Sequence, residues 1–568
     1  MAATLGAIAL VPDEAVLRPK VAWSQALALA AFGLALLQQA WMARLPIRWL
    51  GVVLTGLIPG LVGLLWWWTG PLTSRSLAWD ENTRILLVTV IVWTTSVVLA
   101  TRALRTLCWG TLVCVTVPVA GLAVAQNLAG QLDLPVDRVA RAASTFGNPV
   151  FLGAYLVLAI PLCAAAALFG SGILRWMGAL ATGLALPALL ATQSRWAWLG
   201  GAAAMACGIV LLAPTRRYRR TLLVCLVAGA ALLAALSWKV IQRPQSHALI
   251  WHDTLRMIAE HPWGVGPGQF QVAFLPYASP ELLAAYPRSS VIINDAHCEP
   301  LQILAELGWP GFLAVLAWLT LLLMACLRRL RSMAPTDLER PFLAAIIAAL
   351  VGSVVQSLGS PDLRFLISSM VFATLAGLAA AMDEPANEPR RAPLPLRFAM
   401  AGAGVFVIGW AGHTLLERSR LVAQVRPRDP YVQTADTTHR LLDLLAAVKR
   451  DSGNPELHYN LGVALAEAHR YREAALALRK AAALSPGRAT VVRSLGVVEA
   501  LGGEFAPAVD HLRIALESYP AEAELSYLLA YSSYGLGDIA TAIRELEALL
   551  ATHPEHPQAH LLLEKLRE

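Results

Sequence analysis

Charged residues are scarce in this sequence. They make up 15% of its 568 residues, whereas hydrophobic residues make up 57%. In soluble globular domains, about a quarter of all residues are usually charged. The composition therefore excludes an ordinary soluble protein, and we expect a lipid bilayer to surround most of the chain.

Cysteine is also sparse, and its spacing excludes two kinds of site. The seven cysteines stand singly, without a CxxC pair or a metal-ligand spacing. His297, Cys298 and Glu299 are adjacent, and consecutive side chains rarely converge on one ion. We predict no disulfide, no metal site and no cofactor. The first residues also lack the basic start and cleavage site of a signal peptide, so no cleavage is expected.

Long apolar runs recur from Trp23 to Leu416. A run of about 18 residues or more can cross about 30 Å of hydrocarbon at about 1.5 Å per residue, and we count about twelve. The sequence thus predicts an all-α fold, with a polytopic transmembrane helical bundle over residues 1–418. The runs 105–127 and 172–213 are ambiguous, and the clearest spans are 47–69, 84–104, 150–169, 220–238, 309–327, 341–359, 365–382 and 397–416.

Basic residues indicate the orientation of this bundle. In our helix count the basic clusters fall on one side of the membrane, which the excess of Lys and Arg on inner loops predicts to be the cytoplasm. The long loop at about 239–308 and the C-terminal part then face the other side. Nucleic-acid binding is not expected, because each cluster adjoins an apolar run. The clusters are Arg216, Arg217, Arg219 and Arg220; Arg328, Arg329 and Arg331; Arg390, Arg391 and Arg397; with Arg44, Arg48, Arg102, Arg105 and Arg175 on shorter loops.

Residues 419–568 are more charged and contain an internal repeat. Small, bulky, Ala and Pro positions recur 34 residues apart, which is typical of tetratricopeptide repeats. They predict an α-helical solenoid with repeats at about 453–486, 487–520 and 521–554. It is either a rigid spacer or a docking surface for an acceptor or a protein partner. The aligned positions are Gly462, Gly496 and Ala530; Tyr471, Phe505 and Ile539; Ala474, Ala508 and Ala542; and Pro486, Pro520 and Pro554.

Polar residues concentrate at the predicted outer ends of the spans. The spans themselves contain essentially no Asp or Glu, which disfavours an ion-coupled transporter. Because the polar segments all lie at one membrane boundary, they are the candidate site. They are Arg141-Ala-Ala-Ser-Thr-Phe-Gly-Asn-Pro149, Thr192-Gln-Ser-Arg195, Trp251 to Phe270, and Asn294-Asp-Ala-His-Cys-Glu-Pro-Leu-Gln302 with the following Glu306 to Gly311.

The ordered motifs TFGNP, TQSR, W…HPWGVGPGQF and NDAH…LQILAELGWPG resemble the O-antigen ligase and polymerase superfamily, which includes bacterial O-linked protein oligosaccharyltransferases. The resemblance covers residues 140–312 at motif level. It implies metal-independent glycan transfer from undecaprenyl pyrophosphate to a hydroxyl, with inversion, at the periplasmic face of the inner membrane. The acceptor is lipid A core, which we favour, a growing polysaccharide, or a protein. From other classes, a lipid-linked glycan transporter and a non-catalytic membrane scaffold stay open.

The resemblance also implies roles for two residues. Arg195 is a permanent cation whose planar fork suits pyrophosphate oxygens, and the alternative is interfacial anchoring. His297 would orient or deprotonate the acceptor hydroxyl, since histidine titrates near neutral pH, and the alternative is an ordinary loop histidine. The Leu301 to Gly308 segment has helical spacing, so His297 should precede a helix. Membrane lipids are also expected partners.

Several further residues of these motifs are predicted to bind substrate. The family commonly has Arg at the position of His247, so Arg243 or Arg256 would have to substitute, or His247 would bind as a cation. Cys298 and Pro300 depart from the family pattern as well. We predict Gly264 to Gly268 to be a turn and not a phosphate-binding loop, because Pro267 removes one of the backbone amide donors that such a loop needs. The substrate-binding candidates are Arg141, Asn148, Gln193, His247, Arg256, Asn294 and Glu299.

Overall fold

The computed structural model describes most of the chain, in two compact units. The first unit holds Met1–Leu64, Asn82–Gln245 and Ala296–Arg426, and the second holds Leu65–Glu81, Ser246–Asp295 and Pro427–Glu568. The described residues are 18–42, 44–45, 49–70, 72, 75–132, 141–213, 215–236, 247–285, 293–383, 390–425, 437–450, 452–484, 489–520 and 522–567.

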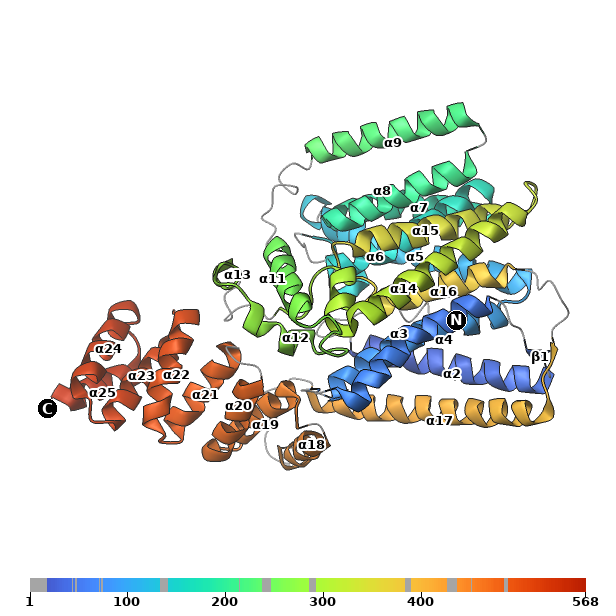
Figure 1. Ribbon diagram of the computed structural model, residues 1–568. Coiled ribbons are helices and arrows are strands. Elements are labelled where there is room, and N and C mark those ends of the chain that lie inside the picture. Colours follow the sequence, from blue (N-terminus) through green and yellow to red (C-terminus); the bar gives the residue numbers. More distant parts are fainter. Residues whose placement is uncertain are drawn as a thin grey trace. The chain divides into compact units, whose positions relative to one another are not determined.

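The regular secondary structure of the described chain is helical apart from one pair of two-residue strands, which confirms the predicted all-α class (Figure 1). Nine of the described helices are long and apolar enough to cross a membrane. The number of about twelve spans stays a prediction. The long helices are α2 (Arg18–Met42), α3 (Leu50–Thr69), α4 (Arg75–Val98), α5 (Arg102–Leu132), α6 (Pro149–Phe169), α7 (Gly172–Ala191), α8 (Arg195–Leu212), α9 (Arg216–Leu236), α14 (Glu299–Ser332), α15 (Arg340–Ser357), α16 (Leu366–Ala381) and α17 (Leu394–Val425).

Two of the predicted span limits differ from those in the structure. The break between 84–104 and 105–127 lies earlier, because α4 ends at Val98 and α5 begins at Arg102. Thr101 directly precedes α5, and its hydroxyl accepts a hydrogen bond from the Leu104 amide at 3.4 Å. Such side-chain capping satisfies an amide that the helix leaves without a partner. The ambiguous run 172–213 is two helices.

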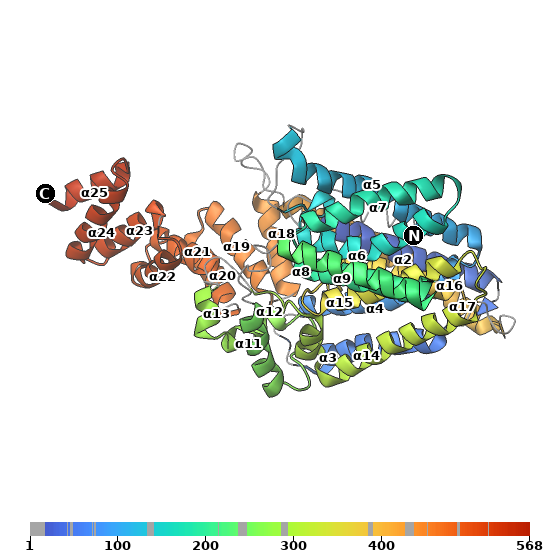
Figure 2. The same ribbon diagram turned by 90° about the horizontal axis from the view of Figure 1, so that it is seen from above.

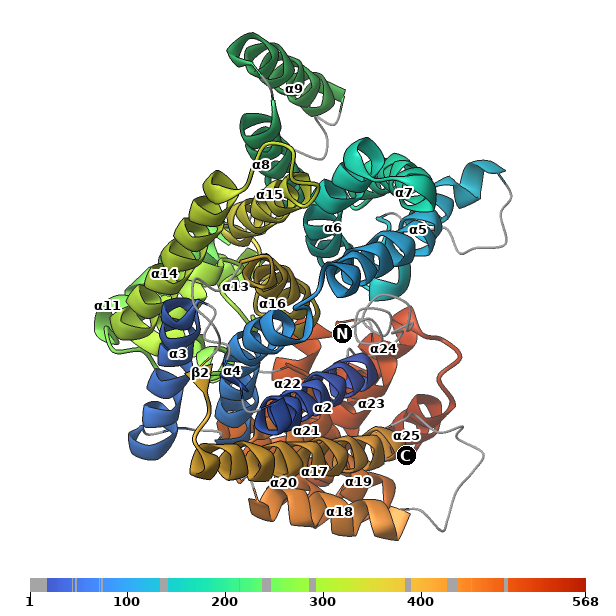
Figure 3. The ribbon, with the colours of Figure 1, turned by 90° about the vertical axis from the view of Figure 1, so that its right-hand side faces the viewer.

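The core of the first unit lies around α6 and α15. In the membrane-spanning part of α6, 83% of the residues are buried within the protein, and in that of α15, 72% are buried. α6 is apolar all round, which is typical of a helix enclosed by others. Small residues allow α8 and α15 to approach closely: a Cβ added at Gly352 would lie 2.7 Å from the Gly200 carbonyl oxygen. α2 and α17 run side by side, as Figures 1 and 3 show.

Several of the predicted basic clusters gather at one end of the first unit. β1 (Arg44–Leu45) pairs with β2 (Arg390–Arg391), and Arg44 lies opposite Arg391. The Arg397 guanidinium donates to the Ala40 carbonyl at 2.8 Å, and Arg329 donates to the Met382 carbonyl at 2.8 Å. These basic residues lie at the same end of the unit, where the sequence analysis expected them to lie together. Whether that end faces the cytoplasm stays a prediction.

Arg105 ties three helices together at this end. Its Nε and Nη2 atoms donate to the two carboxylate oxygens of Glu339, each at 2.8 Å. Its Nη1 atom donates to the Ala100 and Ala381 carbonyls at 3.0 and 3.1 Å. The side chain is largely buried, and this contact joins the segments around α5, α15 and α16.

Replacing Arg105 by alanine is expected to lower the free energy of unfolding by about 3–5 kcal/mol, because the Glu339 carboxylate would remain buried without its cation. Thermal unfolding of the full-length protein in detergent measures this loss. Arg102→Ala is the matched control, since Arg102 is exposed one turn earlier on the same helix. Equal unfolding temperatures for the two variants would contradict the stabilising role of the pair.

The C-terminal helices form the predicted repeat pairs, and Figure 2 shows them following one another in chain order. The three bulky repeat positions, Tyr471, Phe505 and Ile539, are each the first residue of the second helix of a pair. Pro520 and Pro554 follow α22 and α24, and Pro486 lies outside the described residues. The helices are α18 (Thr437–Arg450), α19 (Pro455–Glu467), α20 (Tyr471–Leu484), α21 (Ala489–Leu501), α22 (Phe505–Ser518), α23 (Ala523–Gly535), α24 (Ile539–Thr552) and α25 (Pro557–Arg567).

The small repeat positions explain why these helices pair closely. A Cβ added at Gly462 would lie 2.6 Å from the Leu478 side chain. Ala474, Ala508 and Ala542 are all completely buried. Larger side chains at these positions would separate the helices of each pair. The first limit of this region, residue 419, lies within α17 and stays a prediction.

A buried carboxylate joins three repeat helices and should make their stability depend on pH. Glu499 on α21 is fully buried and contacts Arg479 on α20 at 2.8 Å and His511 on α22 at 2.6 Å. The hydrogen bond to Glu499 raises the pKa of His511. A raised folded-state pKa gives stability that is fully present below the ordinary pKa, about 6.5, and is lost as pH rises through the folded-state value.

We therefore expect amide hydrogen exchange in α21 and α22 of the full-length protein to accelerate, relative to its intrinsic rate, as pH rises above about 6.5. His511→Gln should remove this dependence, whereas His560→Gln, at an exposed position on α25, should not. The same pH dependence in both variants would assign it to another group.

Candidate functional site

Two of the predicted motifs lie together in the first unit. The Arg141 guanidinium donates from Nε to the Thr192 carbonyl at 2.9 Å, and the Ala142 amide donates to the Ala191 carbonyl at 3.0 Å. These contacts join the segment before α6 to the turn before α8. The Arg141 side chain therefore positions the Thr192 turn, and its predicted contact with substrate stays a prediction.

Asn148 caps the N-terminus of α6. Its side-chain oxygen accepts from the Val150 amide at 2.8 Å, and Pro149 is the first residue of the helix. Proline suits this position, because the first helical amide has no partner within the helix. The carboxamide oxygen is thus used by the helix, which leaves the amino group of Asn148 for any substrate contact.

The turn between α7 and α8 presents Arg195 as the first residue of α8. Thr192 is fully buried, and its hydroxyl accepts from the Ser194 amide at 3.2 Å. Gln193 between them has a positive φ of 49°. Only a few per cent of non-glycine residues adopt this left-handed conformation, and such residues often cluster at functional sites. Arg195 itself is half-buried at this end of the helix.

His297 also has a left-handed backbone. Its φ is 49°, it is half-buried, and it lies two residues before α14, which confirms that a helix follows it. Glu299 is the first residue of that helix and is buried; a carboxylate is favourable near a helix N-terminus. Ser144 in the first motif has a φ of 51°. Three motif segments thus each contain a non-glycine residue in an uncommon conformation.

A chain of hydrogen bonds holds the backbone beside His297. The Gln302 side-chain oxygen accepts from the Ala296 amide at 2.7 Å, and its amino group donates to the Glu306 carboxylate at 2.8 Å. Arg364 pairs with the same carboxylate oxygen at 3.1 Å. Glu306 and Gln302 are buried, so water does not compete for these bonds.

The helix that carries this chain ends at a break. Gly308 has φ 64° and ψ −169°, inside the range of α14. This combination is essentially restricted to glycine. The short helix with Gln302 and Glu306 is therefore distinct from the span that follows, and Glu306 lies at the C-terminal end of this short helix.

The segment 359–365 between α15 and α16 completes this region, and sequence reasoning assigned it no role. A Cβ added at Gly359 would lie 1.7 Å from the Trp196 ring, so the indole packs on bare backbone. The Phe151 and Phe365 ring centroids are 3.9 Å apart. Arg364 reaches Glu306, which brings α6, α8, α14 and this segment together. The polar run Ser360-Pro-Asp-Leu-Arg364 between two apolar runs was the available signal.

The remaining candidates belong to the second unit. His247 is the first residue of α11 (His247–Glu260) and is half-buried, whereas Arg256 on the same helix and Asn294 are exposed. Arg243 lies outside the described residues. Asp253 on α11 is fully buried, and its carboxylate accepts from the amide and hydroxyl of Ser279, each at 2.8 Å. That contact holds α11 against the loop that follows α12 (Phe270–Ala273) and precedes α13 (Pro280–Ala285).

The glycine-rich run of the second unit is a turn, as predicted. Gly264, Gly266 and Gly268 have φ values of 92°, 100° and 69°. A Cβ added at Gly268 would also lie 2.5 Å from the Leu77 carbonyl oxygen. Within the described ranges, no three His, Cys, Asp or Glu side chains are grouped so that they could hold a metal ion.

Comparison with known families agrees with this arrangement. Residues 180–316 match the O-antigen ligase family, and residues 455–488 and 501–566 match tetratricopeptide repeat families. The chain carries an O-antigen ligase domain followed by C-terminal tetratricopeptide repeats. The resemblance stated from the motifs is thereby confirmed.

Two other comparisons add little. No curated protein matches the chain significantly. A solved structure titled "MamA RS-1 ArsTM double mutant" is similar to it at 23% identity, over 23% of this chain and 74% of that chain, with a TM-score of 0.22.

The O-antigen ligase family supports glycan transfer in O-antigen or related polysaccharide processes, by a ligase-like or polymerase-like activity on lipid-linked glycans. The matched range of this ligase domain includes Arg195 and His297. It leaves out Arg141, Asn148 and Arg364, which the structure brings to the same region. The helices indicate a multi-pass membrane protein.

Gln302 offers a test of how the ligase domain positions His297. Gln302→Leu keeps the side-chain volume but leaves the Ala296 amide without its acceptor. We expect kcat to fall about tenfold or more, because small displacements of a reacting group are costly, and the KM for the donor to change little. Gln38→Leu, at an exposed site on α2, is the control. An unchanged kcat would show that the Gln302 chain does not position His297.

Proposed function

We propose that this protein transfers a glycan from undecaprenyl pyrophosphate to an acceptor hydroxyl, which belongs to a sugar of lipid A core. The proposal depends on the family match and on one structural observation. Gln193 in the TQSR motif and His297 in the NDAH motif both have a left-handed backbone between buried neighbours. Such costly conformations persist where a site needs them.

Arg195 would bind the pyrophosphate of the donor. As the bond from the anomeric carbon to the phosphate oxygen breaks, the leaving undecaprenyl pyrophosphate takes the electron pair and gains negative charge. A guanidinium at the boundary of the bilayer stabilises that charge more strongly than it would in water. Its planar fork can donate two parallel hydrogen bonds to phosphate oxygens.

His297 would act on the acceptor. Its imidazole accepts the proton of the hydroxyl as the oxygen attacks the anomeric carbon from the side opposite the pyrophosphate. This direct displacement inverts the anomeric carbon and needs no covalent enzyme intermediate. Glu299, Gln193 and Asn148 are proposed to contact the substrates, together with Arg141, and His247, Arg256 and Asn294 from the second unit. The roles of the second-unit residues rest on the resemblance alone.

The active site and the repeats are proposed to face the periplasm. The excess of basic residues at the opposite end of the bundle supports this orientation. A cytoplasm-active reporter fused after Glu568 should then be silent, and a strong signal would reverse the assignment. The repeats are proposed to bind a protein partner, because tetratricopeptide surfaces commonly present a concave binding face.

The test of the function is transfer by the purified full-length protein, with a synthetic undecaprenyl-pyrophosphate-linked glycan as donor. Lipid A core, oligosaccharide and protein acceptors are offered in parallel, and glycan analysis of a deletion strain shows which product is lost. Loss from lipopolysaccharide supports ligation. Loss of chain length alone supports a polymerase, and loss from glycoprotein supports protein glycosylation. Movement of the lipid-linked glycan across vesicles without covalent transfer would favour a transporter.

A further inference from the structure

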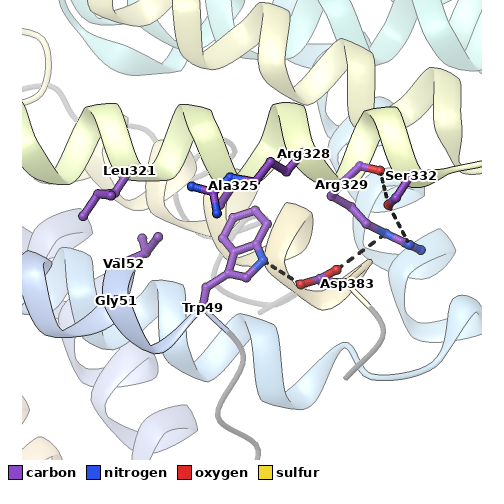
Figure 4. Close-up of a pocket in the computed structure, with 9 residues that line it drawn as sticks. All are labelled: Trp49, Gly51, Val52, Leu321, Ala325, Arg328, Arg329, Ser332 and Asp383. Atoms are coloured by element: carbon purple, nitrogen blue, oxygen red, sulfur yellow. Dashed lines mark hydrogen bonds and ion pairs between the residues drawn. The ribbon is translucent and has the colours of Figure 1, made fainter. Parts of the chain in front are cut away.

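A cavity of about 400 Å³ lies in the first unit, far along α14 from His297 (Figure 4). The start of α3, the last turns of α14 and Asp383, two residues after the end of α16, surround it. Its volume lies in the range of small-molecule sites, about 300–1,000 Å³. The lining residues are Trp49, Gly51, Val52, Leu321, Ala325, Arg328, Arg329, Ser332 and Asp383.

The cavity lies at the membrane boundary opposite the motif segments. Gly308 and Arg328 are twenty residues apart on α14. At about 1.5 Å per residue, this stretch is about 30 Å long, the thickness of the hydrocarbon core. The cavity is therefore a separate feature from the proposed glycan-transfer site. It lies at the basic end of the bundle.

The lining changes from apolar to basic along one face of α14. Leu321 and Ala325 lie nearer the middle of the span, and Arg328, Arg329 and Ser332 follow at helical spacing toward its end. Val52 on α3 adds to the apolar part. A phospholipid changes from apolar to charged in the same direction, because its acyl chains lie toward the middle of the bilayer and its charged headgroup lies at the surface. A soluble phosphate would use only the basic part.

The charged groups differ in how firmly they are held. Arg329 donates to the Met382 carbonyl at 2.8 Å and lies 3.9 Å from the Asp383 carboxylate. The Trp49 indole donates to the same carboxylate at 2.9 Å, from a backbone with a φ of 49°. Asp383 is thus engaged by Trp49 and Arg329.

Arg328 is the cation that this arrangement leaves available. It is exposed, and no carboxylate within the described part of the chain pairs with it. Figure 4 shows its side chain extending from α14 toward the Trp49 indole. Tryptophan is favoured at the level of lipid headgroups, and basic pockets between spans bind anionic headgroups.

We propose that this cavity binds the phosphate of an anionic membrane phospholipid, with Arg328 as its main cationic contact and Trp49 beside the headgroup. Leu321, Ala325 and Val52 contact the beginning of an acyl chain. The bound lipid joins the ends of α3, α14 and α16 at the face opposite the glycan-transfer site.

Native mass spectrometry of the full-length protein in detergent tests the proposal, by titration with phosphatidylglycerol and with phosphatidylcholine. We expect tighter binding of phosphatidylglycerol, and Arg328→Gln to raise its apparent dissociation constant about tenfold, as for loss of one charge-assisted contact. Arg331→Gln is the matched control, because Arg331 is exposed on the same helix end but does not line the cavity.

A second variant tests the cavity without changing charge. A Cβ added at Gly51 meets no atom within 4 Å, so Gly51→Leu should fill the space without a clash and weaken phosphatidylglycerol binding. Equal losses for Arg328→Gln and Arg331→Gln, or equal binding of the two lipids, would overturn the proposal. Displacement of the lipid by inorganic phosphate at equal concentration would also overturn it, in favour of a soluble phosphate.

Discussion

Replacing Arg195 by alanine is expected to lower the rate of glycan transfer by about 10²- to 10³-fold, because the leaving pyrophosphate would lose its principal cation. The rate is measured with purified protein and a synthetic undecaprenyl-linked donor. Arg195→Lys should give an intermediate rate, since the ammonium keeps the charge but not the planar fork.

The control for Arg195 is Arg175→Ala. Arg175 is exposed on α7, at the end of that helix away from the Thr192 turn, and its loss removes one cation from the same bundle. We expect the Arg175 variant to keep the wild-type rate. If Arg195→Ala transfers glycan as fast as this control, Arg195 only anchors α8 at the membrane surface.

Replacing His297 by asparagine should lower the rate by about 10²- to 10⁴-fold, the usual contribution of a general base. Asparagine is chosen because it tolerates the left-handed backbone that His297 adopts, so that a loss cannot be assigned to backbone strain. The Ala296 amide and its Gln302 partner remain as they are. The same donor and acceptor assay gives the measurement.

His252→Asn is the control for this variant, because His252 lies on α11 with 71% of its side chain exposed. It should transfer glycan at the wild-type rate. A His297→Asn variant with a wild-type rate would make His297 an ordinary loop histidine. A normal rate at high pH alone would instead indicate that another base can replace the imidazole.

The sequence by itself determined the features that depend on local physics and on the solvent. Membrane embedding follows from apolar runs of sufficient length, because such a run must lie in the hydrocarbon core, against lipid or against other spans. The repeat helices follow from positions 34 residues apart, such as Gly462 and Gly496, which have to be small for helices to pair. The helix after His297 was likewise predicted, since its helical spacing depends on a few neighbouring residues.

Only the tertiary structure decided which distant side chains meet. Arg364 and Glu306 are 58 positions apart and Arg105 and Glu339 are 234 apart, and no local pattern links either pair. The cavity around Arg328 is of the same kind, since residues from three separate segments line it. Each depends on the packing of whole helices, where small residues such as Gly200 and Gly359 set how closely they approach. Because the spans are apolar whether they face lipid or other helices, composition identifies the spans but not their neighbours.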